Sequence, residues 1–483
     1  MPTWLENLLP ILILLTVVVV VVARLPKQEL GHSAAFKQRR VMNWLPVGLA
    51  YAFMYMARYN LTAYKNAVGM TNADYGTIDE WGSIVYGLAF LLNGPLADRF
   101  GGRTTMMVGI AGSAVMNGVM GYLALDGWQH DEGRTFGYAY AANMYFQSFG
   151  AVSIVKVNAS WFHLRERGTF GGIFGILISL GLYFAYDWTR KIAEMWGVAA
   201  PKNAPAIDPS IAADHWVFWV PALILLVMGT AVALLVRDTP GHAGHADFDT
   251  GDAGSDHKGP ARGLLTLLKL MLTNPVILTI TAIEFCSGFL RNAVMKWHPV
   301  YAKAIGSDDL FVASNWGMLL CCAGILGGVF AGTISDVLFH SRRGPVSAIL
   351  YGGMVLGASG LFFLLGTPAL GWMVLFMSLC VIGVHGMLSG TASMDFGGKK
   401  NVGIVVGIID GFVYLGTALQ AAVLKRILPE GDAAAIADNW WTWPAAMLPA
   451  AIVGLALSFV VWNARARVER PKVAEPKVAG AAG

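Results

Sequence analysis

Two arginines stand inside long apolar stretches of this sequence. Arg291 lies in the run 276–302, and Arg58 lies in LAYAFMYMARYNLTAY, residues 49–64. An arginine at the centre of a membrane helix costs roughly 2.5–3.5 kcal/mol on insertion scales, so it is usually retained where it faces a partner or a polar cavity. Because the guanidinium presents five donors in a planar fork, it suits phosphate or carboxylate. The pair therefore predicts a site for an anion.

The residues around Arg58 indicate a cavity lining. Tyr51, Tyr55, Arg58 and Thr62 follow one another at intervals of four, three and four residues, which places them on one helix face. The alternative is a structural arginine bound to backbone carbonyls. For Arg291 the alternative is an ion pair with Glu284, but seven residues span roughly 10 Å of helix. That separation is too long for direct contact within one straight helix.

Further charged residues lie in the predicted spans. We expect Glu284 to pair with a basic residue of another helix, and proton transfer is its alternative role. For Asp410 a structural or gating ion pair is expected. Lys156 is a candidate partner for either acid, or a third phosphate contact.

Three other side chains are open to two interpretations. His385 stands among small residues, and it could bond to a neighbouring helix or donate to a substrate. Lys296 and His298 lie near the outer end of their span, where such side chains can snorkel to the interface.

The composition is that of a helical membrane protein. The chain has 483 residues, of which 56% are hydrophobic and 13% are charged, against roughly 25% charged in soluble proteins. The net charge of +4 identifies no partner, because the basic residues lie in short loops, and nothing indicates nucleic-acid binding. The four cysteines lie inside apolar runs, and we interpret them as core residues. No metal spacing and no nucleophile–base constellation is present, so we expect neither an enzyme nor a cofactor.

The apolar stretches predict an extra anchor helix at residues 8–23, followed by twelve spans between residues 42 and 462. An interfacial helix is the alternative for the first stretch. Basic residues follow it at 24–41, which places that loop in the cytoplasm. The predicted organisation is an anchor and basic linker at 1–36, a six-helix half at 37–236, a cytoplasmic linker at 237–273, a second half at 274–465 and a disordered tail at 466–483.

The two predicted halves resemble each other. GPLADRFGGR at 94–103 and GTISDVLFHSRRG at 332–344 each place an aspartate, Asp98 or Asp336, four residues after a glycine at a cytoplasmic helix end. Asp98 follows Arg58 by 40 residues and Asp336 follows Arg291 by 45. Both arginines thus occupy the first helix of a half, and a two-fold axis along the membrane normal would bring them to one midplane site. We read Asp98, its neighbour Arg99 and Asp336 as gating or structural charges.

These motifs carry a family resemblance over about residues 40–465. GPLADRFGGR resembles the loop signature of the major facilitator superfamily. More specifically, YMARYNL (55–61), LRNAVMKWHPVYAKA (290–304) and HLRERGTFGGIFG (163–175) resemble the organophosphate:phosphate antiporters, which exchange glycerol 3-phosphate or hexose 6-phosphate for phosphate. The resemblance implies an all-α fold of two six-helix halves.

The resemblance also implies particular site residues. The two arginines that clamp phosphate in that family match Arg58 and Arg291. Tyrosines that line its path match Tyr51, Tyr55, Tyr86 and Tyr414. Two positions depart from the glycerol 3-phosphate exchanger, because Phe90 stands in place of a lysine and Ile178 in place of a histidine. These departures affect the choice of organophosphate rather than the recognition of phosphate.

The resulting expectation is a multi-pass antiporter of a bacterial inner membrane. It would exchange a small phosphorylated metabolite for inorganic phosphate, with the lipid bilayer as its surroundings, and we expect a monomer. Two alternatives remain. The first is a transporter-like membrane sensor of organophosphates, and the second is a proton-coupled organic anion symporter that uses Glu284 or Asp410.

Overall fold

The computed structural model describes residues 31–126, 128, 133–163, 167–196, 214–250, 275–339 and 342–463, with isolated positions at 12–20 and 266–273. Within these ranges the side chains of 167–174, 196, 332–333, 336–337 and 390–403 are left out. Apart from those isolated positions, the predicted anchor helix at 8–23 lies outside the described residues, as do most of the predicted linker and the tail at 466–483.

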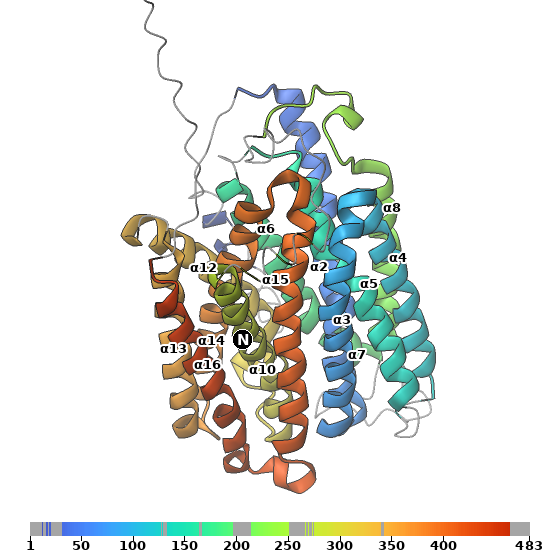
Figure 1. Cartoon of the computed structure of the whole chain (residues 1–483). Coiled ribbons are helices and arrows are strands. Elements are labelled where there is room, and N and C mark those ends of the chain that lie inside the picture. Colours follow the sequence, from blue (N-terminus) through green and yellow to red (C-terminus); the bar gives the residue numbers. More distant parts are fainter. Residues whose placement is uncertain are drawn as a thin grey trace, which may run out of the picture.

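The first half consists of six rods (Figure 1). They are α2 (Ala34–Val68), α3 (Asn72–Phe100), α4 (Gly102–Leu123), α5 (Gly133–Ala159), a bent rod made of α6 (Arg167–Tyr183), the π-helical turn η3 (Phe184–Trp188) and α7 (Thr189–Trp196), and α8 (Trp216–Leu235). A short 3-10 turn, η5 (Gly241–Ala243), follows them.

Six further rods form the second half. They are α10 (Pro275–Ala304), α12 (Trp316–Phe339), α13 (Arg343–Leu364), α14 (Ala369–His385) with the π-helical turn η6 (Gly386–Thr391), α15 (Ala392–Ile427) and α16 (Thr442–Val460). The short helix α11 (Phe311–Ser314) precedes α12, and the 3-10 turns η7 (Gly431–Ala435) and η8 (Ala437–Trp441) precede α16.

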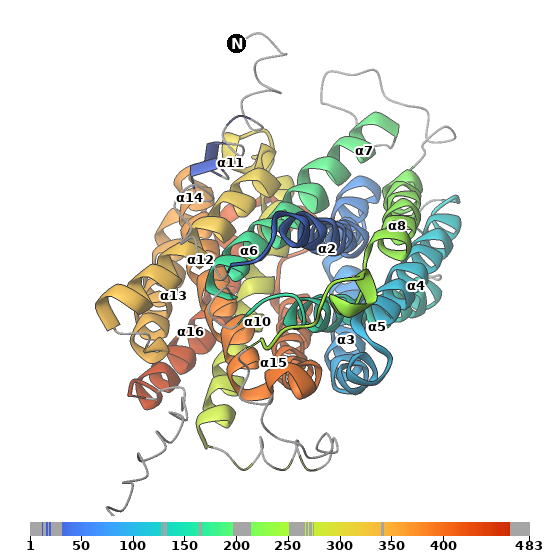
Figure 2. The same cartoon turned by 90° about the horizontal axis from the view of Figure 1, so that it is seen from above.

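The halves lie side by side, as the view from above shows (Figure 2). Across their boundary α3 packs along α15, α6 along α12, and α2 lies beside α10. The first helix of each half therefore faces the interior of the molecule, where the sequence places Arg58 and Arg291. In the described ranges no β-strand occurs.

Among the residues that the structure describes, seven helices are long and apolar enough to cross a membrane by length and composition alone. They are Gly102–Leu123, Trp216–Leu235, Pro275–Ala304, Arg343–Leu364, Ala369–Ser389, Ile404–Ile427 and Ala437–Val460. In Ile404–Ile427, 83% of the 18-residue apolar window is buried inside the molecule, and in Pro275–Ala304 this share is 72%. These are the highest shares among the seven. These two rods are enclosed by other helices rather than facing lipid, which is the placement that a binding site between the halves requires.

The crossing of α3 and α15 depends on glycine. A Cβ atom on Gly87 would lie 2.8 Å from the carbonyl oxygen of Gly411, and one on Gly411 would lie 2.9 Å from the carbonyl oxygen of Gly87. Since real Cβ atoms do not approach backbone so closely, only glycine permits this distance between the helices. The two halves meet there backbone to backbone.

Turn chemistry sets the boundary between α2 and α3. Gly69 ends α2 with φ of 66°, a left-handed conformation that glycine adopts readily. The Thr71 hydroxyl then accepts a hydrogen bond from the Asp74 amide at 3.0 Å and caps α3. The loop is short, so the outer ends of the two helices stay close together.

Candidate functional site

Arg58 is buried at the centre of the molecule with part of its fork unoccupied. Its side chain is 2% exposed. Nη1 donates to the Tyr86 hydroxyl at 2.5 Å and to the Tyr414 hydroxyl at 3.3 Å. Nε and Nη2 find no hydrogen-bond partner among the described residues. A buried cation with unused donors is costly, so these two N–H groups are placed to receive an acceptor from a ligand.

Arg291 reaches the same tyrosine from the other half. Its side chain is 6% exposed, and Nη2 also finds no partner within the described ranges. Its Cζ lies 5.3 Å from the centre of the Tyr414 ring, and Arg58 Cζ lies 5.9 Å from that centre. The two guanidinium carbons are therefore no farther apart than these two distances together. The structure brings both predicted arginines to one tyrosine.

Tyrosines surround Arg58. The Tyr55 ring centre is 4.2 Å from Arg58 Cζ, and Tyr51 packs on Tyr55 at 5.3 Å. Tyr59, which the sequence analysis did not select, lies 5.1 Å from Arg58 Cζ. Aromatic faces and hydroxyls hold the guanidinium without neutralising it, which leaves its charge available to a ligand.

Phe90 is the residue that the resemblance matches to a lysine of the glycerol 3-phosphate exchanger. It is fully buried, and its ring stacks on Tyr414 with centres 5.6 Å apart. It also contacts the Tyr86 ring at 4.8 Å. Phe90 thus packs against two tyrosine rings and orients their hydroxyls, whereas a lysine at this position would place a third cation in the site. Ile178, the other departure, is half-buried in α6.

The acidic residues have partners on other elements. Glu284 in α10 is fully buried, and its Oε2 lies 2.9 Å from Nδ1 of His385, at the end of α14. Asp410 accepts a hydrogen bond from Ser389 in η6. Glu284 thus has the partner on another helix that was expected, and the same-helix pair with Arg291 does not occur.

Lys156 pairs with the motif aspartate rather than with Glu284 or Asp410. Its Nζ lies 2.6 Å from Asp98 Oδ1, and Asp98 Oδ2 accepts from the amide of Ile404 in α15 at 3.3 Å. Asp98 therefore links α5 of its own half with α15 of the other half at the inner end. Arg99 is exposed and lies over Phe100. The side chain of Asp336 lies outside the described set.

Lys296 does not snorkel, and that expectation was wrong. Its side chain is 5% exposed and forms an ion pair with Asp79 of α3, whose side chain is 1% exposed. Asn292, one turn earlier in α10, donates to the other oxygen of the same carboxylate at 2.9 Å. Asp79 was missed because pattern analysis along one helix does not reveal which other helix it faces. The available signal was an acidic residue in one predicted span and a lysine in another, which are opposite in charge.

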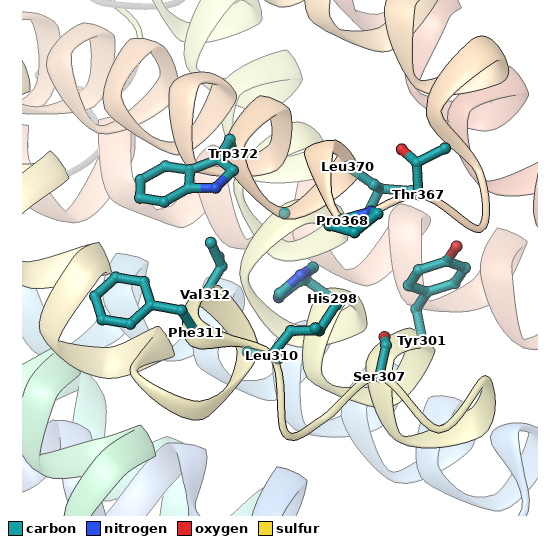
Figure 3. A pocket seen from close by; sticks show the side chains of 12 residues that line it. His298, Tyr301, Ser307, Leu310, Phe311, Val312, Thr367, Pro368, Leu370 and Trp372 are labelled. Carbon is teal, nitrogen blue, oxygen red and sulfur yellow. The ribbon is translucent and has the colours of Figure 1, made fainter. Parts of the chain in front are cut away.

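His298 does not snorkel either. It is 3% exposed, and its ring lies 4.2 Å from that of Trp316. It lines a cavity of about 190 Å³ at the outer end of the second half, between α10, α11 and the start of α14. Figure 3 shows the His298 ring among Leu310, Val312 and Pro368. This cavity is separate from the arginine site, because neither arginine lines it.

Comparison with known proteins identifies the class. Residues 44–421 match the family model described as Major Facilitator Superfamily. The chain therefore belongs to the major facilitator superfamily, and the predicted fold of two six-helix halves is confirmed.

Named relatives cover most of the chain. A glycerol-3-phosphate transporter of Bacillus subtilis is 26% identical over 90% of this chain and 95% of its own length. A membrane sensor protein, UhpC, of Salmonella typhimurium is 24% identical over 83% of this chain and 88% of its own length. A probable hexose phosphate transport protein of Chlamydia trachomatis is 22% identical over 89% of this chain and 92% of its own length.

A solved structure shares the fold. The bacterial homolog of the human lysosomal transporter Spinster, in its inward-facing and occupied conformation, aligns with a TM-score of 0.64. The alignment covers 89% of this chain and 97% of that one at 14% identity.

Proposed function

We propose that this protein is an antiporter that exchanges a small organophosphate for inorganic phosphate by alternating access. The observation that carries the proposal is the pair of buried guanidiniums, one from each half, that approach one tyrosine and have N–H groups without a partner in the described part of the chain. A phosphate monoester offers two negative charges and three terminal oxygens. It can therefore accept hydrogen bonds from both forks at once.

The same arrangement accounts for exchange rather than one-way transport. Without an anion, two desolvated cations lie close together and repel each other, and burial in a low-dielectric interior strengthens that repulsion. A bound phosphate bridges the cations and stabilises the state in which the halves are closed around it. Because the anion binds the closed form better than the open ones, it shifts the population towards that form. The empty carrier reorients slowly, so an outgoing anion must accompany each incoming one.

The relatives support the chemical class of the substrate. Their names include glycerol-3-phosphate, hexose phosphate and phosphoglycerate transporters. All three ligands contain a phosphate monoester, and they differ in the remainder of the molecule. The arginines and Tyr414 are the features suited to the shared group, whereas Phe90 and Ile178 occupy positions that would contact the variable part.

Counterflow in proteoliposomes tests the proposal. Vesicles that contain the purified protein and inorganic phosphate should take up labelled phosphate. External glycerol phosphate, hexose phosphate and phosphoglycerate should compete with that uptake to different degrees. Vesicles without internal phosphate should take up little. Uptake that requires an inward proton gradient, and not internal phosphate, would replace the proposal with proton symport.

The relative named as a membrane sensor favours a second candidate, in which organophosphate binding is signalled without transport. The two functions differ in one measurement. A sensor would bind the organophosphate in detergent with saturation and would show no counterflow after reconstitution. An exchanger shows both.

A further inference from the structure

Acidic side chains of the first half contact donors of the second half at the outer end of the molecule. Asp79 in α3 pairs with Lys296 in α10, and Glu80 beside it pairs with Lys425 in α15. Asp187 accepts hydrogen bonds from the amides of Gly317 and Met318, both at 2.8 Å. The outer ends of the two halves are therefore held together by charge.

Asp187 owes its position to a local feature of the backbone. It lies in the π-helical turn η3, where the extra residue per turn displaces the side chain from the α-helical path. Its carboxylate reaches the first turn of α12, where free amides and the helix dipole favour an anion. It is 6% exposed, so the contact is buried between the halves.

Asp79 is linked to the anion site through its two partners in α10. Asn292, which donates to Asp79, follows Arg291 directly in the chain. Lys296 Nζ lies 5.2 Å from the centre of the Tyr59 ring, and Arg58 Cζ lies 5.1 Å from the same centre. A movement of α10 or α2 that brings the arginines onto an anion must therefore also move Asn292, Lys296 and Tyr59.

The burial of this pair separates it from the other contacts. The side chains of Lys296 and Asp79 are 5% and 1% exposed, whereas those of Lys425 and Glu80 are 15% and 19% exposed. Removing one partner of a buried pair leaves an uncompensated charge, and this is strongly unfavourable. The outer end can therefore open only if both charged side chains become hydrated when their ion pair breaks. Water reaches them when the two halves move apart.

From these contacts we propose that Asp79, Asn292 and Lys296 form an outer latch, which closes the path above the arginines and must break for the site to open outwards. Asp79 and Lys296 are positioning residues in this cycle, since neither needs to touch the anion. The inference requires alternating access and does not depend on which anion is carried, so it can fail while the proposed function stands.

Ser83 offers a reporter for the latch. It is fully buried in α3, four residues after Asp79 and three before Tyr86, on the same face. It thus lies between the latch and the arginine site. A Ser83→Cys variant is nearly isosteric, and its thiol should react with a membrane-impermeant methanethiosulfonate added outside only when the outer end opens. The parent chain, whose four native cysteines are buried, provides the background.

The test measures this labelling rate in right-side-out membrane vesicles that contain inorganic phosphate. Combining Asp79→Asn with Lys296→Met removes the latch without leaving a lone charge, and we expect the rate to rise about tenfold or more. Exchanging the charges, Asp79→Lys with Lys296→Asp, should return the rate to that of the parent. Asp79→Asn alone should reduce phosphate exchange by about tenfold or more.

Asp308→Asn is the matched control, because Asp308 pairs with Lys303 within the second half and both side chains are partly exposed, at 36% and 50%. It should change neither labelling nor exchange. An unchanged labelling rate in the neutral double variant, at equal protein amount and thermal stability, would overturn the latch. The latch would also be overturned if the variant with swapped charges, Asp79→Lys with Lys296→Asp, did not return the labelling rate to that of the parent.

If the neutral double variant, Asp79→Asn with Lys296→Met, does not fold, a second double variant tests the latch. Asp79→Cys with Lys296→Cys can be joined by a short bis-methanethiosulfonate reagent that reducing agents cleave. Joined protein should lose phosphate exchange and regain it after reduction. Continued exchange by the joined protein would refute the proposal.

Discussion

Replacing Arg58 by lysine keeps the charge of the site and removes the fork. In the structure Nη1 is occupied by Tyr86 and Tyr414, and Nε and Nη2 have no hydrogen-bond partner among the residues described. A lysine ammonium is a point charge on a flexible chain and cannot place two donors in one plane. We therefore expect Arg58→Lys to lose at least one charge-assisted hydrogen bond to the anion.

The size of the effect follows from that single bond. Hydrogen bonds to charged groups contribute about 1.5–3 kcal/mol, which corresponds to roughly a 10- to 150-fold loss at 1.4 kcal/mol per tenfold. The same reasoning applies to Arg291→Lys, because its Nη2 also lacks a partner within the described ranges. If the bond is stronger in the closed form than in the open ones, the loss appears in the maximal rate as well as in the KM.

The assay is labelled-phosphate counterflow at several external phosphate concentrations, which separates KM from the maximal rate. Arg426→Lys is the matched control. Arg426 is exposed and donates to the Ala422 carbonyl within its own helix, α15, so its replacement should leave both values near those of the parent. Normal counterflow by Arg58→Lys at low external phosphate would refute the two-fork site.

Three further substitutions test other features of the structure. Lys156→Met should lower the maximal exchange rate with little change in KM, because Lys156 binds Asp98 at the inner end; a raised KM with an unchanged rate would instead indicate a phosphate contact. Gly288→Ala should destabilise the second half by about 1–3 kcal/mol, because the added Cβ would meet the Val413 carbonyl. The thermal unfolding midpoint in detergent should therefore fall. Gly328→Ala is the control, because its Cβ would meet open space, and it should leave the midpoint unchanged. Asp187→Leu should weaken the outer contact with α12 and increase outside labelling of a Ser83→Cys thiol; labelling equal to that of the Ser83→Cys parent would contradict this.

The sequence allowed prediction of the features that one helix carries by itself. The apolar runs, the duplicated loop motif and the arginine in the first helix of each half all predicted the fold, and the fold was confirmed. The four-three-four spacing from Tyr51 to Thr62 placed Arg58 on a polar face, and the structure has Tyr55 on that guanidinium. These features repeat locally, so they can be recognised without knowing which helices are neighbours.

Partners on distant helices could not be found in this way. Asp79 and Lys296 are 217 residues apart in the chain, and Gly317 lies 130 residues from Asp187. Helical periodicity fixes which residues share a face, but not which face of another helix lies opposite. For the same reason Lys156 was linked to the wrong acids, and Lys296 was interpreted as an interfacial side chain. The functional roles of the two arginines stay predictions until transport is measured.

Near both of its ends, helix α3 has an acidic side chain that contacts the opposite half: Asp79 contacts α10 and Asp98 contacts α15. The two residues are 19 positions apart, which corresponds to roughly 28 Å of helix. The hydrocarbon layer of a typical bilayer is roughly 30 Å thick. Shorter or longer acyl chains would move one of these carboxylates relative to its headgroup region. The speed of this carrier should therefore respond to lipid chain length, with a maximum in membranes whose thickness matches α3.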